Sequence, residues 1–141
     1  WSRSFPHLES LFPRIGDRGR WDPFLVIRLK RWSGGRVAII GDAAHAMAPN
    51  LGQGGGCGMM NGLSLAVYLD RHDDVAAALD NWERSERPLT EHTQRLSTIY
   101  GWPTTWPPWF RAWAYDLAHK SAWLNRQRLR TANHTPTGWQ G

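Results

Sequence analysis

The sequence predicts an α/β fold in which two short strands are followed by a mainly helical region. Residues 24–31 alternate between apolar and polar side chains, which is the pattern of a half-exposed strand. Residues 36–40 (RVAII) are continuously apolar after the first position, which is typical of a short strand buried on both faces. Residues 33–35 between them are expected to form a turn. From about Gly54 the apolar residues recur at spacings of three and four, the period of an α-helix.

Two long helices are expected after the strands. The first runs from about Gly54 to Leu69, and its apolar positions form one stripe on the helix surface: Met59, Leu63, Ala66 and Val67. Asp73 or Asp74 is expected to cap the second helix, because an aspartate side chain accepts hydrogen bonds from the free N–H groups of a first turn. Pro88 is expected to interrupt or restart this second helix, which then continues to Gly101.

The second helix carries an apolar face and a charged pair. Val75, Leu79 and Trp82 share one face, which is expected to be buried. Glu83 and Arg87 have the i,i+4 spacing at which opposite charges meet on a helix surface. This pattern indicates an amphipathic helix that packs against the rest of the chain.

A loop over residues 102–110 leads into a last helix that is expected to run to about Arg130. Pro107 and Pro108 fit its first turn, where a missing N–H is tolerated. Tryptophans recur at helical spacing in this region, and they could form an aromatic wall for a substrate. Such a stripe is more often core, or an interface with the rest of a larger domain, and this interpretation is preferred for Trp106, Trp109 and Trp113.

Composition and charge narrow the class of protein. The chain has 141 residues, of which 41% are hydrophobic and 21% charged, as in one globular domain or part of one. Its formal charge of +5 suits anionic ligands, and because no block of like charges occurs we expect no nucleic-acid partner. The single cysteine, Cys57, is typical of a reducing compartment, so we expect a cytoplasmic protein. No apolar run is long enough for a membrane span.

The most informative stretch is GDAAHAMAPNLGQGGG, residues 41–56. Gly41 follows the expected apolar strand, and a residue without Cβ lets a ligand come close to the carboxyl end of that strand. Asp42 then offers a carboxylate, which accepts hydrogen bonds from hydroxyl groups and repels phosphates. A polyol is therefore the better expectation for the partner of Asp42.

The second half of the stretch supplies glycines and a helix N-terminus. Pro49 and Asn50 are expected to turn the chain, and the glycines that follow let the backbone approach a flat group. The first N–H groups and the positive dipole end of the next helix would stabilise an anionic ring by about 0.3–1 kcal/mol. A ligand with a hydroxylated chain at one end and an electron-accepting ring at the other fits both halves, and a flavin has this constitution.

Residues 32–66 resemble the second flavin-binding motif of the class A FAD-dependent aromatic monooxygenases, the p-hydroxybenzoate hydroxylase-like (PHBH-like) family. The family pattern W-x-x-G-R-V-x-L-x-G-D-A-A-H, followed by P-x-x-G-Q-G and a helix, is matched in register from Trp32 through Gly41 to Gly54. Residues 82–88 resemble a further helix of the family that carries W-E-R and a proline. The resemblance implies the C-terminal part of a PHBH-like FAD-binding fold.

By this resemblance Asp42 binds the ribityl hydroxyls of FAD, and the backbone of residues 51–56 lies at the pyrimidine edge of the flavin ring. The implied cofactor-binding residues are Gly41, Asp42, Ala43, Pro49, Leu51, Gly52, Gln53, Gly54, Gly55 and Gly56. Three positions depart from the family, since Gly56 replaces its common Asn, Asn61 its Asp and Gly62 the following Ala. The sequence names no catalytic acid or base and no metal ligand.

Two family motifs do not occur in this sequence, namely the G-x-G-x-x-G that binds the ADP part of FAD and the D-G motif used for FAD and NADPH. Because the first residue is Trp1 rather than Met, we expect a C-terminal fragment whose missing N-terminal portion supplies most of the cofactor affinity. FAD binding by the chain alone should therefore be weak or undetectable. The expected division is residues 1–31 as the end of a substrate-domain sheet, 32–70 as the FAD-binding strand, loop and helix, and 71–141 as a C-terminal helical region.

The resemblance implies a flavin-dependent monooxygenase that hydroxylates an aromatic (phenolic) or related small substrate with NAD(P)H and O₂. Epoxidases have nearly the same motif, so hydroxylation and epoxidation both stay open, as do NADPH and NADH. A homo-oligomer is compatible with the sequence. The alternative is a non-catalytic helical interaction module that retains the flavin motif and uses its tryptophans to contact a partner or a second copy.

Three further side chains near the motif each have a structural and a functional interpretation. His45 has the chemistry of a base or a metal ligand, but it is expected to hold the turn by hydrogen bonds. Cys57 is near a helix N-terminus, which can lower a thiol pKa, but it is expected to be a small packed residue. Gln53 is expected either to touch the flavin ring or to fix the loop.

Overall fold

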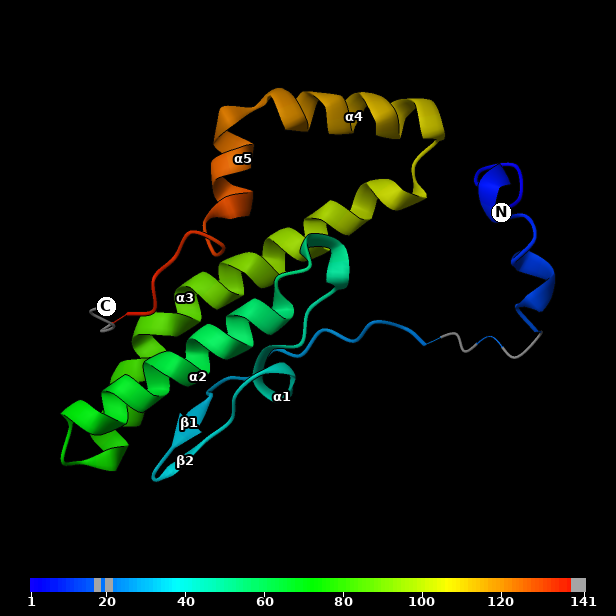
Figure 1. Ribbon diagram of the computed structural model, residues 1–141. Helices are drawn as coiled ribbons and strands as arrows, with labels where there is room; N and C mark the ends of the chain where they lie inside the picture. The colour runs from blue at the N-terminus through cyan, green and yellow to red at the C-terminus, as the bar shows by residue number, and fades with distance from the viewer. Residues whose placement is uncertain (17–18, 20–21, 138–141) are drawn as a thin grey trace.

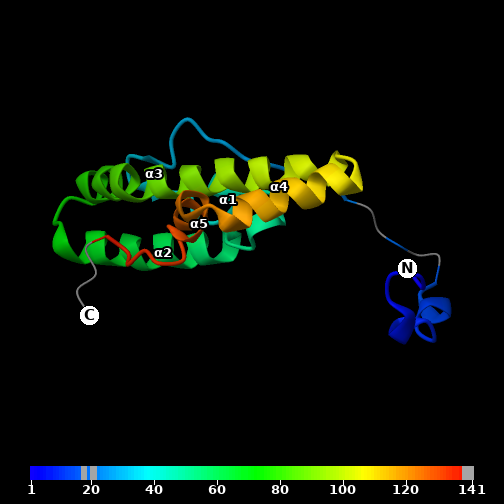
Figure 2. The same cartoon turned by 90° about the horizontal axis from the view of Figure 1, so that it is seen from above.

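The computed structural model describes residues 1–16, 19 and 22–137. Its body is a pair of long antiparallel helices, α2 (Gly54–Arg71) and α3 (Val75–Gly101), which lie side by side (Figure 1). Four short 3-10 turns also occur in the described residues: η1 (Pro6–Leu8), η2 (Phe12–Arg14), η3 (Pro49–Leu51) and η4 (Trp102–Thr105). Figures 1 and 2 both place η1 and η2 apart from the helical body.

Two short strands precede the helices, as predicted, but they begin and end at other residues. β1 (Ser33–Gly34) pairs antiparallel with β2 (Val37–Ala38), and Gly35 closes the turn with a positive φ of 58°. The prediction of a strand over residues 24–31 was wrong. Within the described chain the backbone of this segment makes one hydrogen bond to the backbone of a distant residue, from the N–H of Ile27 to the carbonyl of Ala46 (3.0 Å). The alternating pattern arises because one side of this segment is half-buried. A β-strand also needs a neighbouring strand for its backbone hydrogen bonds, and this segment has none among the described residues.

The interpretation of residues 36–40 as a strand buried on both faces was also wrong. Val37 is 66% exposed, and Ile39 and Ile40 are exposed as well. Of this run, Ala38 packs against the core. Within the described residues the sheet has two strands, so an apolar run here lacks the second layer that would bury it.

Both long helices follow from local sequence signals. α2 begins at the predicted residue, and Asp74 caps α3 by accepting a hydrogen bond from the N–H of Ala76 (3.0 Å). The expected interruption at Pro88 does not occur, because α3 continues through it. The carbonyl that loses its partner belongs to Arg84, and both this residue and Pro88 are exposed, so that water can satisfy the free group.

Polar side chains fill much of the contact between α2 and α3. The buried residues of α2 are Cys57, Asn61 and Ser64. The amide of Asn61 donates to Oγ1 of Thr90 (3.2 Å), and the hydroxyl of Ser64 donates to Glu86 (3.0 Å). The apolar stripe predicted for α2 lies largely on the opposite side, where Met59 is 75% exposed. The periodicity was correct, but it does not indicate which of two faces meets the partner helix.

The apolar core lies where α1 (Asp42–His45) and the hairpin meet the long helices. Trp32, Ala44 and Trp82 are its buried members, and partly buried residues pack against them: Leu29, Ala38, Leu65 and Tyr68. The rings of Trp32 and Trp82 are 5.9 Å apart between centroids. Nε1 of Trp82 donates a hydrogen bond to the carbonyl of Asn61 (2.9 Å), which links the core to α2.

The single last helix predicted to Arg130 is two helices, α4 (Pro108–Lys120) and α5 (Ala122–Leu129). Ser121 separates them with an extended ψ of 107°, and its hydroxyl accepts from the N–H of Leu124 (3.3 Å), so that it caps α5. Pro108 is the first residue of α4, as predicted, and Pro107 is its N-cap.

Of the two placements preferred for the tryptophan stripe, a core within the described chain is wrong, since Trp109 and Trp113 are exposed, and an interface with the rest of a larger domain stays a prediction. Trp113 stacks on Phe110, with 5.4 Å between ring centroids. Among the described residues, no helix combines the length and apolarity that crossing a membrane requires.

Candidate functional site

The predicted site residues form one continuous turn between the hairpin and α2. Gly41 precedes α1 with φ 64° and ψ −147°, a conformation that is essentially restricted to glycine. Asp42 and Ala43 are the first, exposed residues of α1. Pro49 and Leu51 lie in η3, and Gly52 follows in the left-handed conformation with φ 65°. Gln53 is the N-cap of α2, whose first turn consists of Gly54, Gly55 and Gly56.

The first turns of α2 lie directly against the start of α1. A Cβ added at Gly58 would be 3.5 Å from the Cα of Gly41, and one at Gly54 would be 3.5 Å from Cγ of Met47. A Cβ at either distance would make an ordinary van der Waals contact, so the values show that the start of α2 packs against Gly41 and Met47 and do not show that glycine is required there. As a result, the carboxylate of Asp42 and the N-terminal end of α2 belong to the same part of the surface.

The other glycines of the turn face open space. A Cβ at Gly52, Gly55 or Gly56 would meet no atom within 4 Å among the described residues. Gly52 has a left-handed φ that favours glycine, whereas at Gly55 and Gly56 neither such a φ nor packing among the described residues requires the absence of a side chain. The open backbone at these positions leaves room for a flat ring to come close.

The N-terminus of α2 has N–H groups available for such a ligand. Gln53, at the N-cap position, makes no side-chain hydrogen bond to the first turn, and that turn has no acidic residue. The first N–H groups of a helix have no intrahelical partner and carry its positive dipole end. They can therefore bind an anion, or a ring oxygen that becomes negatively charged.

Asp42 is exposed, and no hydrogen bond or ion pair holds its carboxylate within the part of the chain that the structure describes. It is not used as a cap, since α1 has no side-chain cap hydrogen bond. This carboxylate is therefore free to accept hydrogen bonds from a ligand.

Gln53 fixes the loop. Its Nε2 donates to the carbonyl of Arg128 in α5 (2.9 Å), 75 residues away in sequence. Its Oε1 is buried and has no hydrogen-bond partner among the described residues. Of the two interpretations from sequence, the observed hydrogen bond supports loop fixation, and contact with a flavin ring stays a prediction for Oε1.

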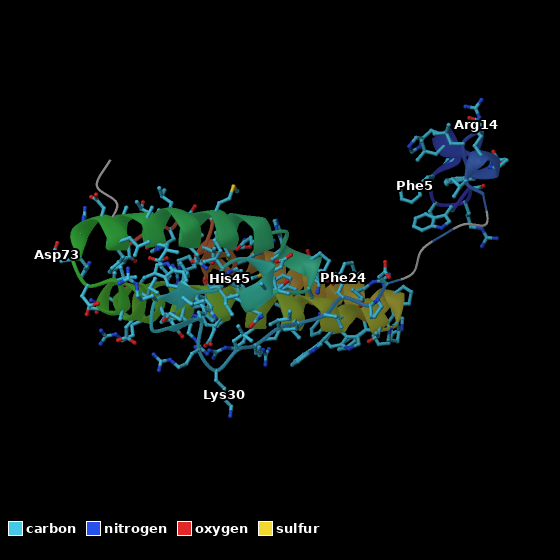
Figure 3. All side chains as sticks on the ribbon, turned by 90° about the horizontal axis from the view of Figure 1, so that it is seen from below. Phe5, Arg14, Phe24, Lys30, His45 and Asp73 are labelled. Atoms are coloured by element: carbon cyan, nitrogen blue, oxygen red, sulfur yellow. The ribbon has the colours of Figure 1, made fainter. Side chains whose placement is uncertain are left out.

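His45 has a structural position in the core. It is 1% exposed, its ring lies 5.1 Å from that of Trp32, and burial lowers the pKa of its imidazole. Figure 3 shows its label within the body, far from Phe5 and Arg14 in the N-terminal segment. The amide of Asn61 donates to Nε2 (3.0 Å), so the neutral ring carries its proton on Nδ1. Asn61, which replaces the family's aspartate, thus serves as a donor to a neutral histidine.

Cys57 is a packed residue, as expected. It is completely buried in α2, and burial raises the pKa of its thiol despite the nearby helix N-terminus. A neutral, inaccessible thiol is a poor nucleophile. No group of three or more His, Cys, Asp or Glu side chains in the described residues could hold a metal ion.

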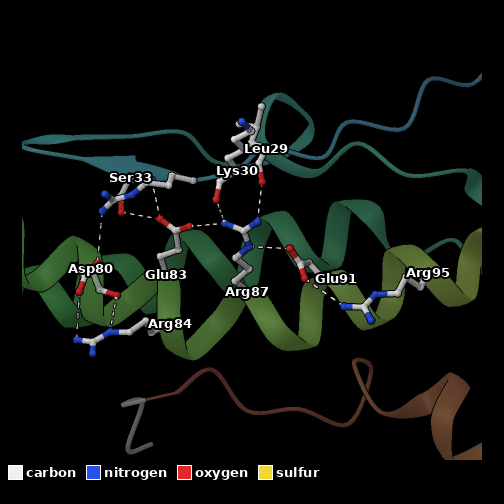
Figure 4. A network of polar contacts seen from close by, with 10 residues as sticks. Leu29, Lys30, Ser33, Asp80, Glu83, Arg84, Arg87, Glu91 and Arg95 are labelled. Atoms are coloured by element: carbon white, nitrogen blue, oxygen red, sulfur yellow. Dashed lines mark hydrogen bonds and ion pairs between the residues drawn. The ribbon is translucent and has the colours of Figure 1, made fainter.

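A charged network joins α3 to the extended segment before the hairpin (Figure 4). Glu83 accepts hydrogen bonds from the N–H and hydroxyl of Ser33 (both 2.8 Å) and from Arg87 (2.6 Å). Arg87 also donates to the carbonyls of Leu29 (2.6 Å) and Lys30 (2.8 Å). The i,i+4 pair predicted from sequence is therefore present, and its role is to hold backbone in place.

Two polar residues of α3 that contact the site were missed by the sequence analysis. The amide of Gln94 donates to the carbonyl of Ala46 (2.8 Å), and the hydroxyl of Ser97 donates to the carbonyl of Ala48. Both residues continue a polar stripe at spacings of three and four along α3: Glu83, Glu86, Thr90, Gln94 and Ser97. This stripe was the signal in the sequence. Polar residues that recur at helical spacing, on a helix whose charged residues also lie on another side, could have indicated a buried polar face of α3.

A helix N-terminus beside one exposed carboxylate, at the end of a strand, is the arrangement expected of an α/β protein that binds a dinucleotide or a flavin. Comparison with known families makes the class specific. The family model described as FAD binding domain matches residues 24–98, more than half of the chain, and the chain belongs to this family.

Individual relatives are consistent with this assignment. Over 138 residues the chain is 45% identical to a putative 2-heptyl-3-hydroxy-4(1H)-quinolone synthase of Rhodococcus erythropolis. The matched region covers 98% of this chain and 36% of that protein. Over 103 residues it is 41% identical to a kynurenine 3-monooxygenase of Xanthomonas euvesicatoria pv. vesicatoria. This match covers 69% of this chain and 22% of that protein. The crystal structure of a 2-methyl-3-hydroxypyridine-5-carboxylic acid oxygenase matches with a TM-score of 0.75 at 35% identity, over 96% of this chain and 34% of that one.

These findings confirm the recognised family, the PHBH-like fold of its C-terminal part and FAD as its cofactor. The chain spans about a third of the length of the quinolone synthase and of the oxygenase. The roles of the individual residues of the turn stay predictions.

Proposed function

We propose that this chain is part of an FAD-dependent monooxygenase that hydroxylates an aromatic or heteroaromatic small molecule with NAD(P)H and O₂. One observation carries the proposal: Gly52, Gly55 and Gly56 leave open backbone next to the unpaired carboxylate of Asp42. The names of the relatives support the substrate class, because they refer to a quinolone, a kynurenine and a hydroxypyridine.

The residues of the turn would bind and orient the cofactor. Asp42 would accept hydrogen bonds from ribityl hydroxyls, and the open glycines would let the ring lie on the backbone of residues 52–56. The N–H groups at the start of α2 would stabilise negative charge at the pyrimidine edge of the ring. Bound FAD supplies the redox chemistry, and the protein supplies orientation and electrostatics.

The substitution Asp42→Ala tests the ribityl role. In the polypeptide encoded by the complete reading frame that contains this chain, we expect FAD affinity to fall by roughly 10- to 100-fold, the effect of losing hydrogen bonds to a charged acceptor. Flavin fluorescence on titration measures the affinity. Asp116→Ala is the control, because this exposed carboxylate pairs with Lys120 on α4 and should leave affinity unchanged.

Two outcomes of that titration contradict the proposal at different levels. Equal FAD affinity of the Asp42→Ala variant and the unsubstituted protein would remove the ribityl role of this residue. If the unsubstituted protein neither retains nor binds FAD, the flavoenzyme assignment itself fails, and the non-catalytic module becomes the better interpretation.

The pair Gly56→Ala and Gly62→Ala tests whether the open glycines are kept for a ligand. Both lie in α2, and an added Cβ would meet no described atom within 4 Å at either position. Each substitution should raise helix stability in the absence of FAD by about 0.5–1 kcal/mol, measured by urea unfolding. Gly56→Ala alone should weaken FAD binding, by about 1–3 kcal/mol, because its methyl group would overlap the ring. Equal FAD affinity of the two variants would contradict a ring site at Gly56.

A non-catalytic interaction module remains the second candidate. The observation that favours it is the exposure of large apolar side chains on the C-terminal helices: Trp102, Trp109, Trp113 and Trp123. Self-association would cover such a surface, and the related hydroxypyridine carboxylic acid oxygenase has been solved in a tetrameric form. A homo-oligomer is compatible with both candidates, so FAD retention and not oligomeric state separates them.

A further inference from the structure

Gln94 has an unusual position for a long polar side chain. It lies in the second half of α3 and is 2% exposed. Its Nε2 donates two hydrogen bonds to backbone carbonyls of different segments, to Ile27 (2.7 Å) and to Ala46 (2.8 Å). Because both N–H groups of this buried amide donate to carbonyls, the surrounding backbone determines the orientation of the amide.

The two segments that Gln94 joins are themselves in contact. The N–H of Ile27 donates to the same carbonyl of Ala46 (3.0 Å). The amide of Gln94 therefore closes a ring of three hydrogen bonds between the extended segment, the residue after α1 and helix α3. It supplies the contacts that a neighbouring strand would make to these carbonyls, in a region where no strand is formed.

The same part of α3 holds the next residues of the loop. The hydroxyl of Ser97 donates to the carbonyl of Ala48, and Nδ2 of Asn50 donates back to the carbonyl of Ser97 (2.8 Å). Every second residue of the loop, namely Ala46, Ala48 and Asn50, is thus hydrogen-bonded to one helical turn of α3. The open glycines begin at Gly52, two residues beyond the last attachment.

We propose that Gln94 is a positioning residue. Together with Ser97 it fixes the position, relative to α3, of the loop that contacts the flavin ring. This rests on the proposed function. Only a side chain with two N–H groups at this length satisfies both carbonyls, so the requirement is for glutamine and not for polarity in general. A carboxylate would present acceptors to two acceptors, and an apolar side chain would leave the carbonyl of Ile27 without its donor.

The test compares Gln94→Met with a control that loses a buried hydrogen bond elsewhere. Ser64→Ala is suitable, because the Ser64 hydroxyl is buried and bonds Glu86 and the carbonyl of Thr137, away from the loop. In the polypeptide from the complete reading frame, Gln94→Met should weaken FAD binding by about tenfold and change the visible absorption and circular dichroism of the bound flavin. Ser64→Ala should lower the unfolding midpoint while affinity and spectrum stay those of the unsubstituted protein.

A measurement on the 141-residue chain without FAD keeps the proposal testable if a variant binds no cofactor. Amide hydrogen exchange of Ile27, followed by NMR, should be at least tenfold faster in Gln94→Met than in Ser64→Ala at equal global stability. Gln94→Glu should show the same acceleration, because it keeps the shape and removes the donors.

The outcomes separate this proposal from the proposed function. If the unsubstituted protein binds FAD and Gln94→Met equals Ser64→Ala in spectrum, affinity and Ile27 exchange, the positioning role is wrong and the flavoenzyme assignment stands. If the unsubstituted protein binds no FAD but Ile27 exchange responds as expected, Gln94 holds the loop but the flavin assignment fails.

Discussion

Replacing Trp82 with alanine is expected to lower the free energy of unfolding by about 3–5 kcal/mol, the usual cost of truncating a buried tryptophan. Trp82 is completely buried, packs against Trp32 and is the largest fully buried side chain of the described residues. Its loss would leave a cavity where the hairpin, α2 and α3 meet. The carbonyl of Asn61 would also lose the hydrogen bond from the indole of Trp82. Since α3 holds the site loop, this variant should lose FAD binding as well.

Urea unfolding followed by far-ultraviolet circular dichroism is the appropriate measurement, because ten tryptophans make fluorescence ambiguous. Trp109→Ala is the matched control, since that ring is 75% exposed and its removal should change stability by less than about 0.5 kcal/mol. Trp82→Phe should fall between them, as it keeps an aromatic ring but loses the hydrogen bond. Similar unfolding midpoints for the two alanine variants would show that Trp82 does not anchor the core.

The helices were predictable because their signals are local. The spacing of apolar residues placed α2, and Asp74 marked the start of α3 by its capping chemistry. Pro88 was given too much weight. A proline ends a helix where the freed carbonyl cannot be satisfied, and here that carbonyl belongs to Arg84 on the exposed side.

The strands and the buried faces were less predictable because they depend on distant partners. Residues 24–31 have a strand pattern, but the carbonyl of Ile27 is bonded by the side chain of Gln94, 67 residues later. Likewise, the buried side of α2 is set by the hydroxyl and carboxyl groups that α3 offers, such as Thr90 and Glu86. Hydrophobic periodicity contains no information about such polar matches.

The candidate site likewise has a part that was predictable from local sequence and a part that depends on distant residues. Gly41, Asp42 and the glycines of residues 52–56 lie close together in sequence, so their residue types and spacing sufficed to predict that they form one turn, and their contacts to a flavin stay a proposal. This turn is held by residues far away in sequence: the side chains of Gln94 and Ser97 donate to its backbone carbonyls, and the carbonyl of Arg128 accepts from the side chain of Gln53. Their contribution becomes visible only when the chain is folded.

Glu83→Ala is expected to cost about 2–4 kcal/mol, the second largest effect on stability, because it breaks a largely buried charged contact. The N–H and hydroxyl of Ser33 would lose their acceptor, and Arg87 would lose one of its two acidic partners among the described residues and keep Glu91. Glu83→Gln should cost less, since its amide oxygen can still accept from Ser33 while its amide nitrogen faces the guanidinium group. Urea midpoints at pH 7 measure both effects, and Asp116→Ala, an exposed pair on α4, is the control.

The pH dependence of the same contact gives an independent check, and its sign follows from the pKa of Glu83. Burial alone would raise that pKa, but hydrogen bonds from the backbone, from the Ser33 hydroxyl and from Arg87 outweigh it and hold the pKa below its ordinary value. The unfolded chain therefore binds the proton first, so the stabilisation is complete above the ordinary glutamate pKa of about 4.3 and is lost as pH falls through the lower folded value. The unsubstituted chain should lose more stability over this acidic range than Glu83→Gln, which has no proton to gain there. If both lose stability in parallel, the carboxylate is not held as an ion, and the network of Figure 4 does not stabilise the attachment of α3 to the hairpin through charge.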